Sequence, residues 1–334
     1  MWRLKTVLSR NSDERGVAGV IVAVMMLVLI GAGAMAVDVG QIYAERAQLQ
    51  NGADSGALAV ARSCKHSLCD PTLANGLANA NSNDNASNST VDLSVAGQVT
   101  VTTTTKNGSS SFLSKLFANA LGSGPVTVAA QATATADFPG GGSAFPLALS
   151  DNCFNLSATN TSGEVQKLSY KPGTTCTGPS GTQIPGGWGW LTESSPCIAT
   201  TTVGTDGMAS DPGNNPPSGC STILDGWKAT ILAGGEVKVL FPVFDTSSGT
   251  GAGGSFHIIG YATFKIWGWK FGNNHSYEFR DTSSDPGMTS ALACSGGQDR
   301  CIIGQFVKYE TTDASNGDTP SGDDLGTSII KLIK

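Results

Sequence analysis

Cysteine and histidine are the residues of this chain that could bind a metal ion or carry redox chemistry. Neither type has the spacing that such chemistry needs, because no C-x-x-C occurs and no cysteine stands at ligand spacing from a histidine. The three histidines are His66, His257 and His275. We therefore expect no metal site and no bound cofactor. The eight cysteines all follow residue 63, and an even number predicts four disulfides in an oxidising compartment.

The spacing of the cysteines favours bridges between neighbours along the chain. Cys64 and Cys69 are five residues apart, and within one helix they would lie too far from each other to form a bridge. Their pairing therefore requires the preceding helix to end near Cys64. The middle four allow three connectivities, and spacing favours neighbours only mildly. The predicted bridges are Cys64–Cys69, Cys294–Cys301 and, by preference, Cys153–Cys176 with Cys197–Cys220.

Catalytic and nucleic-acid-binding signals are missing from the sequence. There is no G-x-S-x-G, no H-E-x-x-H and no P-loop, so we expect no enzymatic activity and no small-molecule substrate. The chain has 20 basic and 26 acidic residues with no basic stripe, which argues against a nucleic-acid partner.

Two Trp-Gly-Trp motifs could recognise sugar rings or a partner protein. Strand alternation would place Trp267 and Trp269 on one face, and Trp188 and Trp190 stand at the same spacing. The alternative, which we favour, is that these rings fill a core that is poor in leucine.

The element that must position the rest of the chain is an N-terminal apolar helix. Gly16–Val37 holds 22 residues without a charge, and about 33 Å of helix matches the roughly 30 Å hydrocarbon core of a bilayer. Residues 38–62 continue with helix-favouring composition. We expect one helix that begins in the membrane and continues outside it. A cleaved signal peptide is the alternative, with Ala34-Met35-Ala36 as its cleavage site.

Charge predicts the orientation of this helix. Four Lys/Arg lie in the fifteen residues before the span, and the next basic residue after it is Arg46. The positive-inside rule places the N-terminus in the cytoplasm and the remaining 297 residues outside the cell membrane, as in a single-pass protein.

A polar row follows the span on one helix face. Its members are Tyr43, Arg46, Gln50 and Asp54. The i, i+4 spacing lets Gln50 contact both Arg46 and Asp54. We expect this row to pack against the rest of the protein or against a partner helix, with Glu45 on the opposite, solvated face; the alternative is a fully solvated row. Nearby, Gly52-x-x-x-Gly56 would allow close helix approach.

The helix carries a family resemblance. The apolar run that follows Arg15-Gly16 is succeeded by Val37-Asp38-Val39-Gly40, Tyr43, Arg46, Leu49-Gln50-Asn51, Asp54 and Ala57-Leu58-Ala59. This pattern resembles the N-terminal segment of TadE/TadG-like proteins of Flp (tight adherence) pilus assembly. The resemblance implies a bacterial, membrane-anchored accessory protein of a type IV-like pilus or secretion apparatus, with the bilayer and pilus-assembly or secretion proteins as partners.

Two departures and one further likeness refine the resemblance. Class III prepilins are similar to one another in a leader that is cleaved after Gly and followed by Glu at the fifth residue. In this chain the fifth residue after Gly16 is Ile21, so we expect no peptidase processing at Gly16. No DxSxS motif is present, so a metal-dependent adhesion site is not expected. Blocks in the second half also resemble actinobacterial TadG-like proteins: Phe145-Pro-Leu, Pro185-Gly-Gly-Trp-Gly-Trp-Leu, Phe241-Pro-Val-Phe-Asp and Cys301-Ile-Ile-Gly-Gln-Phe.

These patterns predict an α+β fold with a mainly β, sandwich-like second part pinned by disulfides. The expected parts are a cytoplasmic basic segment (1–15), a transmembrane helix (16–37), its extracytoplasmic continuation (38–62), a small α/β domain (63–138), a linker (139–143) and a cysteine-stapled β-rich domain (144–334). The favoured function is a non-enzymatic accessory role in Flp/Tad pilus assembly. The alternative is a surface-anchored adhesin or carbohydrate-binding protein that uses the Trp-Gly-Trp motifs.

Overall fold

The computed structural model divides the chain into two compact units. Unit 1 holds Met1–Cys64, Leu68–Thr135 and Leu332–Lys334, and unit 2 holds Lys65–Ser67 and Ala136–Lys331. The residues that the structure describes are 14–66, 68–106, 117, 124–154, 156, 164–170, 176–177, 183–184, 187–205, 208–209, 216–217, 219–248, 254–272, 276–294, 299–307, 310–312 and 322–333.

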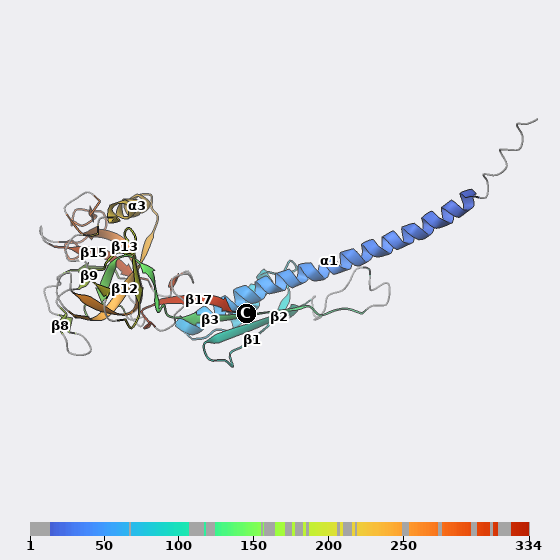
Figure 1. Cartoon of the computed structure of the whole chain (residues 1–334), viewed down its shortest axis with the longest axis horizontal. Coiled ribbons are helices and arrows are strands. Elements are labelled where there is room, and N and C mark those ends of the chain that lie inside the picture. Colours follow the sequence, from blue (N-terminus) through green and yellow to red (C-terminus); the bar gives the residue numbers. More distant parts are fainter. Residues whose placement is uncertain are drawn as a thin grey trace, which may run out of the picture. The chain divides into compact units, whose positions relative to one another are not determined.

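Helix α1 (Glu14–His66) runs unbroken for 53 residues, which confirms the long N-terminal apolar helix. Its first half has no other helix or strand beside it in Figure 1. Its second half buries Leu49, Ala53, Ala57 and Val60, which recur every three to four residues and therefore form one stripe. The helix ends at His66, four residues later than the sequence analysis expects, so Cys64 lies in its last turn.

The remainder of unit 1 is a short helix and an antiparallel sheet. Helix α2 (Thr72–Ala80) follows Asp70, whose Oδ1 accepts the backbone N–H of Thr72 at 3.0 Å and so caps the first turn. Strand β1 (Ser87–Asp92) pairs with β2 (Gln98–Thr105), which pairs with β3 (Ala129–Asp137). Burial alternates along β2 and β3, so these strands present one face to the core.

Helix α1 lies against the buried face of this sheet. The hydroxyl of Thr103 on β2 donates to the carbonyl oxygen of Leu49 at 2.8 Å, and Leu49 clusters with Val128 and Ala130. A small sheet covered by one long helix is thus the architecture of the described part of unit 1.

Unit 2 is mainly β. Its elements are β4 (Gly141–Ala144), β5 (Leu147–Ser150), β6 (Gln166–Ser169), β7 (Cys176–Thr177), β8 (Gln183–Ile184), β9 (Trp188–Trp190), β10 (Ala199–Thr202), β11 (Met208–Ala209), α3 (Cys220–Leu232), β12 (Val237–Ser248), β13 (Ser255–Lys270), β14 (Glu278–Phe279), β15 (Cys301–Phe306), β16 (Glu310–Thr312) and β17 (Thr327–Ile333). The main sheet has the order β6-β15-β13-β12-β5-β9, with β11 and β14 also on β13, and β5 runs parallel to β12.

The core of unit 2 is aromatic. Trp190 lies 5.2 Å from Phe271 and 5.8 Å from Trp188, measured between ring centroids, and Phe145 contacts the same group. Helix α3 adds Leu224 and Ile231 to this cluster and packs Trp227 against it. Aromatic rings supply large buried areas. The sequence analysis expects a core that is poor in leucine, and this is wrong, because Leu147, Leu149 and Leu168 are fully buried in the same cluster.

Three features differ from the expectations. Residues 141–143, expected in a linker, lie in β4, which pairs with β10 because Gly and Ser at these positions still offer a regular backbone ladder. Helix α3 was not expected, and in the described residues of unit 2 it, rather than a second large sheet, packs on the core. The C-terminal end, expected in the β-rich domain, groups with unit 1 through Leu332–Lys334. The helix expected over residues 111–121 lies outside the described residues, Phe117 apart.

Candidate membrane anchor and partner-binding helix

The first half of α1 is an apolar surface with no protein cover. Its most apolar window has a mean hydropathy of 2.8 and none of it is buried, and Leu27 and Ile30 are 74% and 72% exposed. Within the described part of the chain, this is one helix long and apolar enough to cross a bilayer. A bare apolar cylinder of this length is unfavourable in water, so the segment fits a membrane anchor.

Protein cover begins at Asp38, the residue directly after the predicted span. Asp38 is only 4% exposed, and its Oδ1 accepts the backbone N–H of Phe117 at 3.0 Å. A buried carboxylate must be hydrogen-bonded to be tolerated, so Asp38 marks where the helix enters folded protein.

The structure separates the predicted polar row into two halves. Gln50 donates from Nε2 to Oδ1 of Asp54 at 2.8 Å and to the carbonyl oxygen of Gln131 at 3.2 Å, which ties α1 to β3. Tyr43 is 70% exposed, and Arg46 is exposed as well. The far half of the row is therefore used inside unit 1, while Tyr43 and Arg46, the half nearest the span, are exposed.

The helical wheel predicts that Glu45 is solvated, and this prediction is wrong. Glu45 is half-buried, and desolvation by that burial, followed by the nearby Asp84 carboxylate, raises its pKa above the usual value of 4.5. The wheel failed because the loop that follows α2 covers this side of α1, where the side chain of Gln48 accepts the backbone N–H of Asn83 at 2.8 Å.

The pair Gly52 and Gly56 is used within unit 1. A Cβ added at Gly52 would lie 3.0 Å from the Cα of Ala78, and one at Gly56 would lie 3.3 Å from the Cα of Ala74. Both alanines are on α2, so the two glycines let the helices approach until their backbones nearly touch.

Disulfides join the last turn of α1 to the residues that follow it and close two loops of unit 2. The bonds present are Cys64–Cys69, Cys197–Cys220 and Cys294–Cys301, which are pairs that the sequence favours. Cys153 is also disulfide-bonded, and its pairing with Cys176 remains a prediction. Closing a loop of 23 residues, as Cys197–Cys220 does, stabilises the folded state by about 3 kcal/mol in the chain-entropy model.

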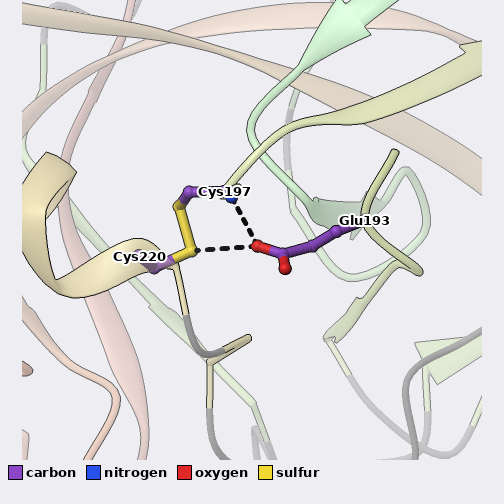
Figure 2. A group of neighbouring side chains, drawn as sticks. All are labelled: Glu193, Cys197 and Cys220. Carbon is purple, nitrogen blue, oxygen red and sulfur yellow. Dashed lines mark hydrogen bonds between the residues drawn. A yellow bond between two sulfur atoms is a disulfide. The ribbon is translucent and has the colours of Figure 1, made fainter. Parts of the chain in front are cut away.

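Glu193 lies beside the Cys197–Cys220 bridge, and the three side chains could be mistaken for a metal site (Figure 2). The Oε1 of Glu193 accepts the backbone N–H of Cys197 and lies 3.9 Å from the Sγ of Cys220. Two sulfurs bonded to each other present no thiolate, which is the form that binds metals. The carboxylate instead holds the turn at Cys197, whose φ of 57° is in the left-handed region.

The tryptophans do not form the aromatic surface that the sequence left open. Trp188, Trp190 and Trp269 are at most 2% exposed, and the indole N–H groups of Trp188 and Trp269 donate to the carbonyl oxygens of Leu168 and Ser276, both at 3.1 Å. Trp267 alone among the four motif tryptophans is partly exposed.

A β-bulge separates Trp267 from Trp269, which alternation would place on one face. On β15 Gly304 and Ile303 are successive, but they face Ile266 and Gly268 of β13, so Trp267 is the extra residue. Beyond the bulge the alternation shifts by one. Trp269 enters the aromatic core, and Trp267 packs on the other face of the sheet with Met288 and Ile303.

His257 belongs to a group of polar side chains near the end of β12. The Nδ1 of His257 lies 2.8 Å from the Oδ1 of Asp245, and Asp151 and Asp323 are near. His66 and His275 lie outside the described side chains. Desolvation, followed by the charges of Asp323 and Asp245, raises the pKa of Asp151 above the usual 3.8.

Replacing Asp151 by Asn is expected to stabilise unit 2 at neutral pH. Because the folded pKa is raised, the folded state binds more protons, and stability falls as pH rises from 3.8 through the folded pKa. Asp151→Asn abolishes this loss, so its melting temperature should exceed the wild-type value by a few degrees at neutral pH and not in acid. An equal difference at both pH values would contradict the electrostatic origin.

Comparisons with known proteins concern α1 alone. No curated protein and no solved structure matches the chain. A family model does match, and its boundaries fall within two and three residues of the ends of α1. Residues 16–63 match the model of the putative Flp pilus-assembly TadE/G-like family, which is the family that the sequence resembles.

Proposed function

We propose that this chain is a membrane-anchored, non-enzymatic accessory protein of Flp/Tad pilus assembly. The family match points to a role in Flp pilus assembly, and it coincides with α1 rather than with the rest of the chain. The coincidence is the observation that carries the proposal. In this chain the matched residues form a helix whose first half is bare and apolar and whose second half is packed into a small domain.

Two features support an N-terminus in the cytoplasm and both units outside. Basic residues precede the span, which the positive-inside rule associates with the cytoplasmic side. Disulfides occur in both units, and such bonds persist in oxidising compartments.

The anchor should be retained in the membrane. We expect trypsin added to spheroplasts to remove both units and to leave a membrane-protected fragment containing the span, because the bilayer shields it. N-terminal sequencing of the untreated protein checks the alternative. A soluble product that begins at Val37 would show that Ala34-Met35-Ala36 is cleaved as a signal, and the anchor proposal would fall.

Tyr43 and Arg46 are the residues that should contact a partner. They are exposed on α1 about 9–14 Å beyond the end of the span, at the 1.5 Å rise of a helix. Aromatic and arginine side chains dominate the energetics of protein interfaces. The double variant Tyr43→Ala with Arg46→Ala should reduce co-purification with the pilus-assembly proteins at least tenfold, since two such truncations cost above about 1.4 kcal/mol in binding.

Arg62→Ala is the matched control for this experiment. It removes an exposed arginine from the same helix, 16 residues further along and on another side of it. The control should co-purify like wild type, and the double variant should keep wild-type membrane levels because neither side chain is buried. If the double variant co-purifies like wild type, the partner interface does not include Tyr43 and Arg46.

A further inference from the structure

Unit 1 contains a polar hollow that the anchoring role does not use. It has a volume of about 460 Å³ and lies between the start of α2, the edge strand β1 and the residue that follows β2. The residues that line it are Pro71, Thr72, Asn75, Ser87, Asn88, Ser89, Val91 and Lys106. Its volume falls within the range of about 300–1,000 Å³ that is usual for small-ligand pockets.

The lining is rich in hydroxyl and amide groups. Five of its eight side chains are Ser, Thr or Asn, none is a carboxylate and none is aromatic. Some serve the fold: the hydroxyl of Ser87 donates to Oδ1 of Asn79 at 3.3 Å, and that of Thr72 donates to Oδ1 of Asp70 at 2.6 Å. The side chains of Asn75 and Ser89 make no hydrogen bond to a described residue, so these polar groups remain for a ligand.

Lys106 adds the charge. It is half-buried at the rim, and within the described ranges its ammonium has no carboxylate partner. A partly desolvated ammonium is stabilised by an anion. Serine and asparagine groups at close spacing donate to and accept from vicinal hydroxyls, because each offers both functions. Pro71 and Val91 are the two apolar residues of the lining.

We propose that this hollow binds an acidic sugar, a polyhydroxylated ring with one carboxylate, such as the units of carboxylated envelope polysaccharides. The carboxylate pairs with Lys106, and the ring hydroxyls bond to Asn75 and Ser89. This binding is independent of the proposed pilus partner, since it uses neither α1 residue exposed near the membrane.

The test titrates D-glucuronate into full-length protein in detergent micelles, labelled at the valine methyl groups. Val91 lines the hollow, and comparison with a Val91→Ala spectrum identifies its signal. Glucuronate should shift this signal saturably. Lys106→Gln should weaken binding about tenfold, as expected for the loss of one charge-assisted contact. Asn75→Ala should weaken it as well.

Two probes and one variant make the test decisive. Glucose lacks the carboxylate and acetate lacks the hydroxyls, so each should bind at least tenfold more weakly than glucuronate. Lys238→Gln, which removes an exposed lysine of unit 2, should bind glucuronate like wild type. The proposal is overturned if glucuronate causes no saturable shift, if acetate binds equally well, or if Lys106→Gln binds like wild type with its unligated spectrum unchanged.

Discussion

Trp269→Ala is expected to lower the free energy of unfolding of unit 2 by about 3–5 kcal/mol. The side chain is fully buried, lies 5.1 Å from Phe279 and 5.8 Å from Trp227 between ring centroids, and donates from Nε1 to Ser276. Truncation removes a large apolar area and leaves a cavity among rigid rings. It also leaves the carbonyl oxygen of Ser276 without its hydrogen-bond donor. Urea unfolding followed by tryptophan fluorescence measures the loss, because five of the six tryptophans lie in unit 2.

Trp267→Ala is the matched control, since it removes the same side chain two residues away. Trp267 is partly exposed and packs in the smaller cluster of the opposite sheet face, so its truncation should cost less than about 2 kcal/mol. Its buried indole N–H has no hydrogen-bond partner among the described residues, and Trp267→Phe should therefore be close to neutral. Equal losses for the two alanine variants would show that the bulge does not separate the rings.

Gly52→Val is expected to destabilise unit 1 by about 2–3 kcal/mol. The new Cβ would lie 3.0 Å from the Cα of Ala78, and the two γ-carbons would have to enter backbone that cannot rotate away. The helices would separate and uncover the stripe that ends at Val60. Hydrogen exchange of the β2 amides reports the change, because α1 covers that strand.

Gly76→Ala supplies the contrast on the other helix of the same pair. A Cβ at Gly76 meets nothing within 4 Å, so alanine adds helix propensity without a clash and should stabilise by roughly 0.5–1 kcal/mol. Faster exchange in Gly76→Ala would mean that this glycine faces packed protein, and unchanged exchange in Gly52→Val would mean that the two helices do not pack at Gly52.

Local patterns determined α1 and the disulfide chemistry. The sequence suffices to find the helix and its family resemblance, because the signals lie in one continuous segment. They are a charge-free run of bilayer length, a stripe of small residues and about nine specific positions at fixed spacing. The same holds for the alternating strands β2 and β3, whose period of two is set by the backbone alone. The sequence also held a signal for helix α3, since Cys220, Leu224, Trp227 and Ile231 recur at helical spacing. The flanking Gly and Pro residues hid this pattern.

Tertiary structure alone decided which side chains face each other. The bulge at Trp267 depends on the partner strand β15, so no periodicity within β13 could show that Trp267 and Trp269 lie on opposite faces of the sheet. Glu45 is half-buried because a loop near residue 83 crosses it, and the helical wheel contains no such loop. The polar hollow joins Asn75, Ser89 and Lys106 from three separate elements. Burial and charge proximity arise from contacts between residues distant in sequence, whereas helix period, strand period and hydrophobic length arise within one segment, and this is why the anchor could be predicted and these sites could not.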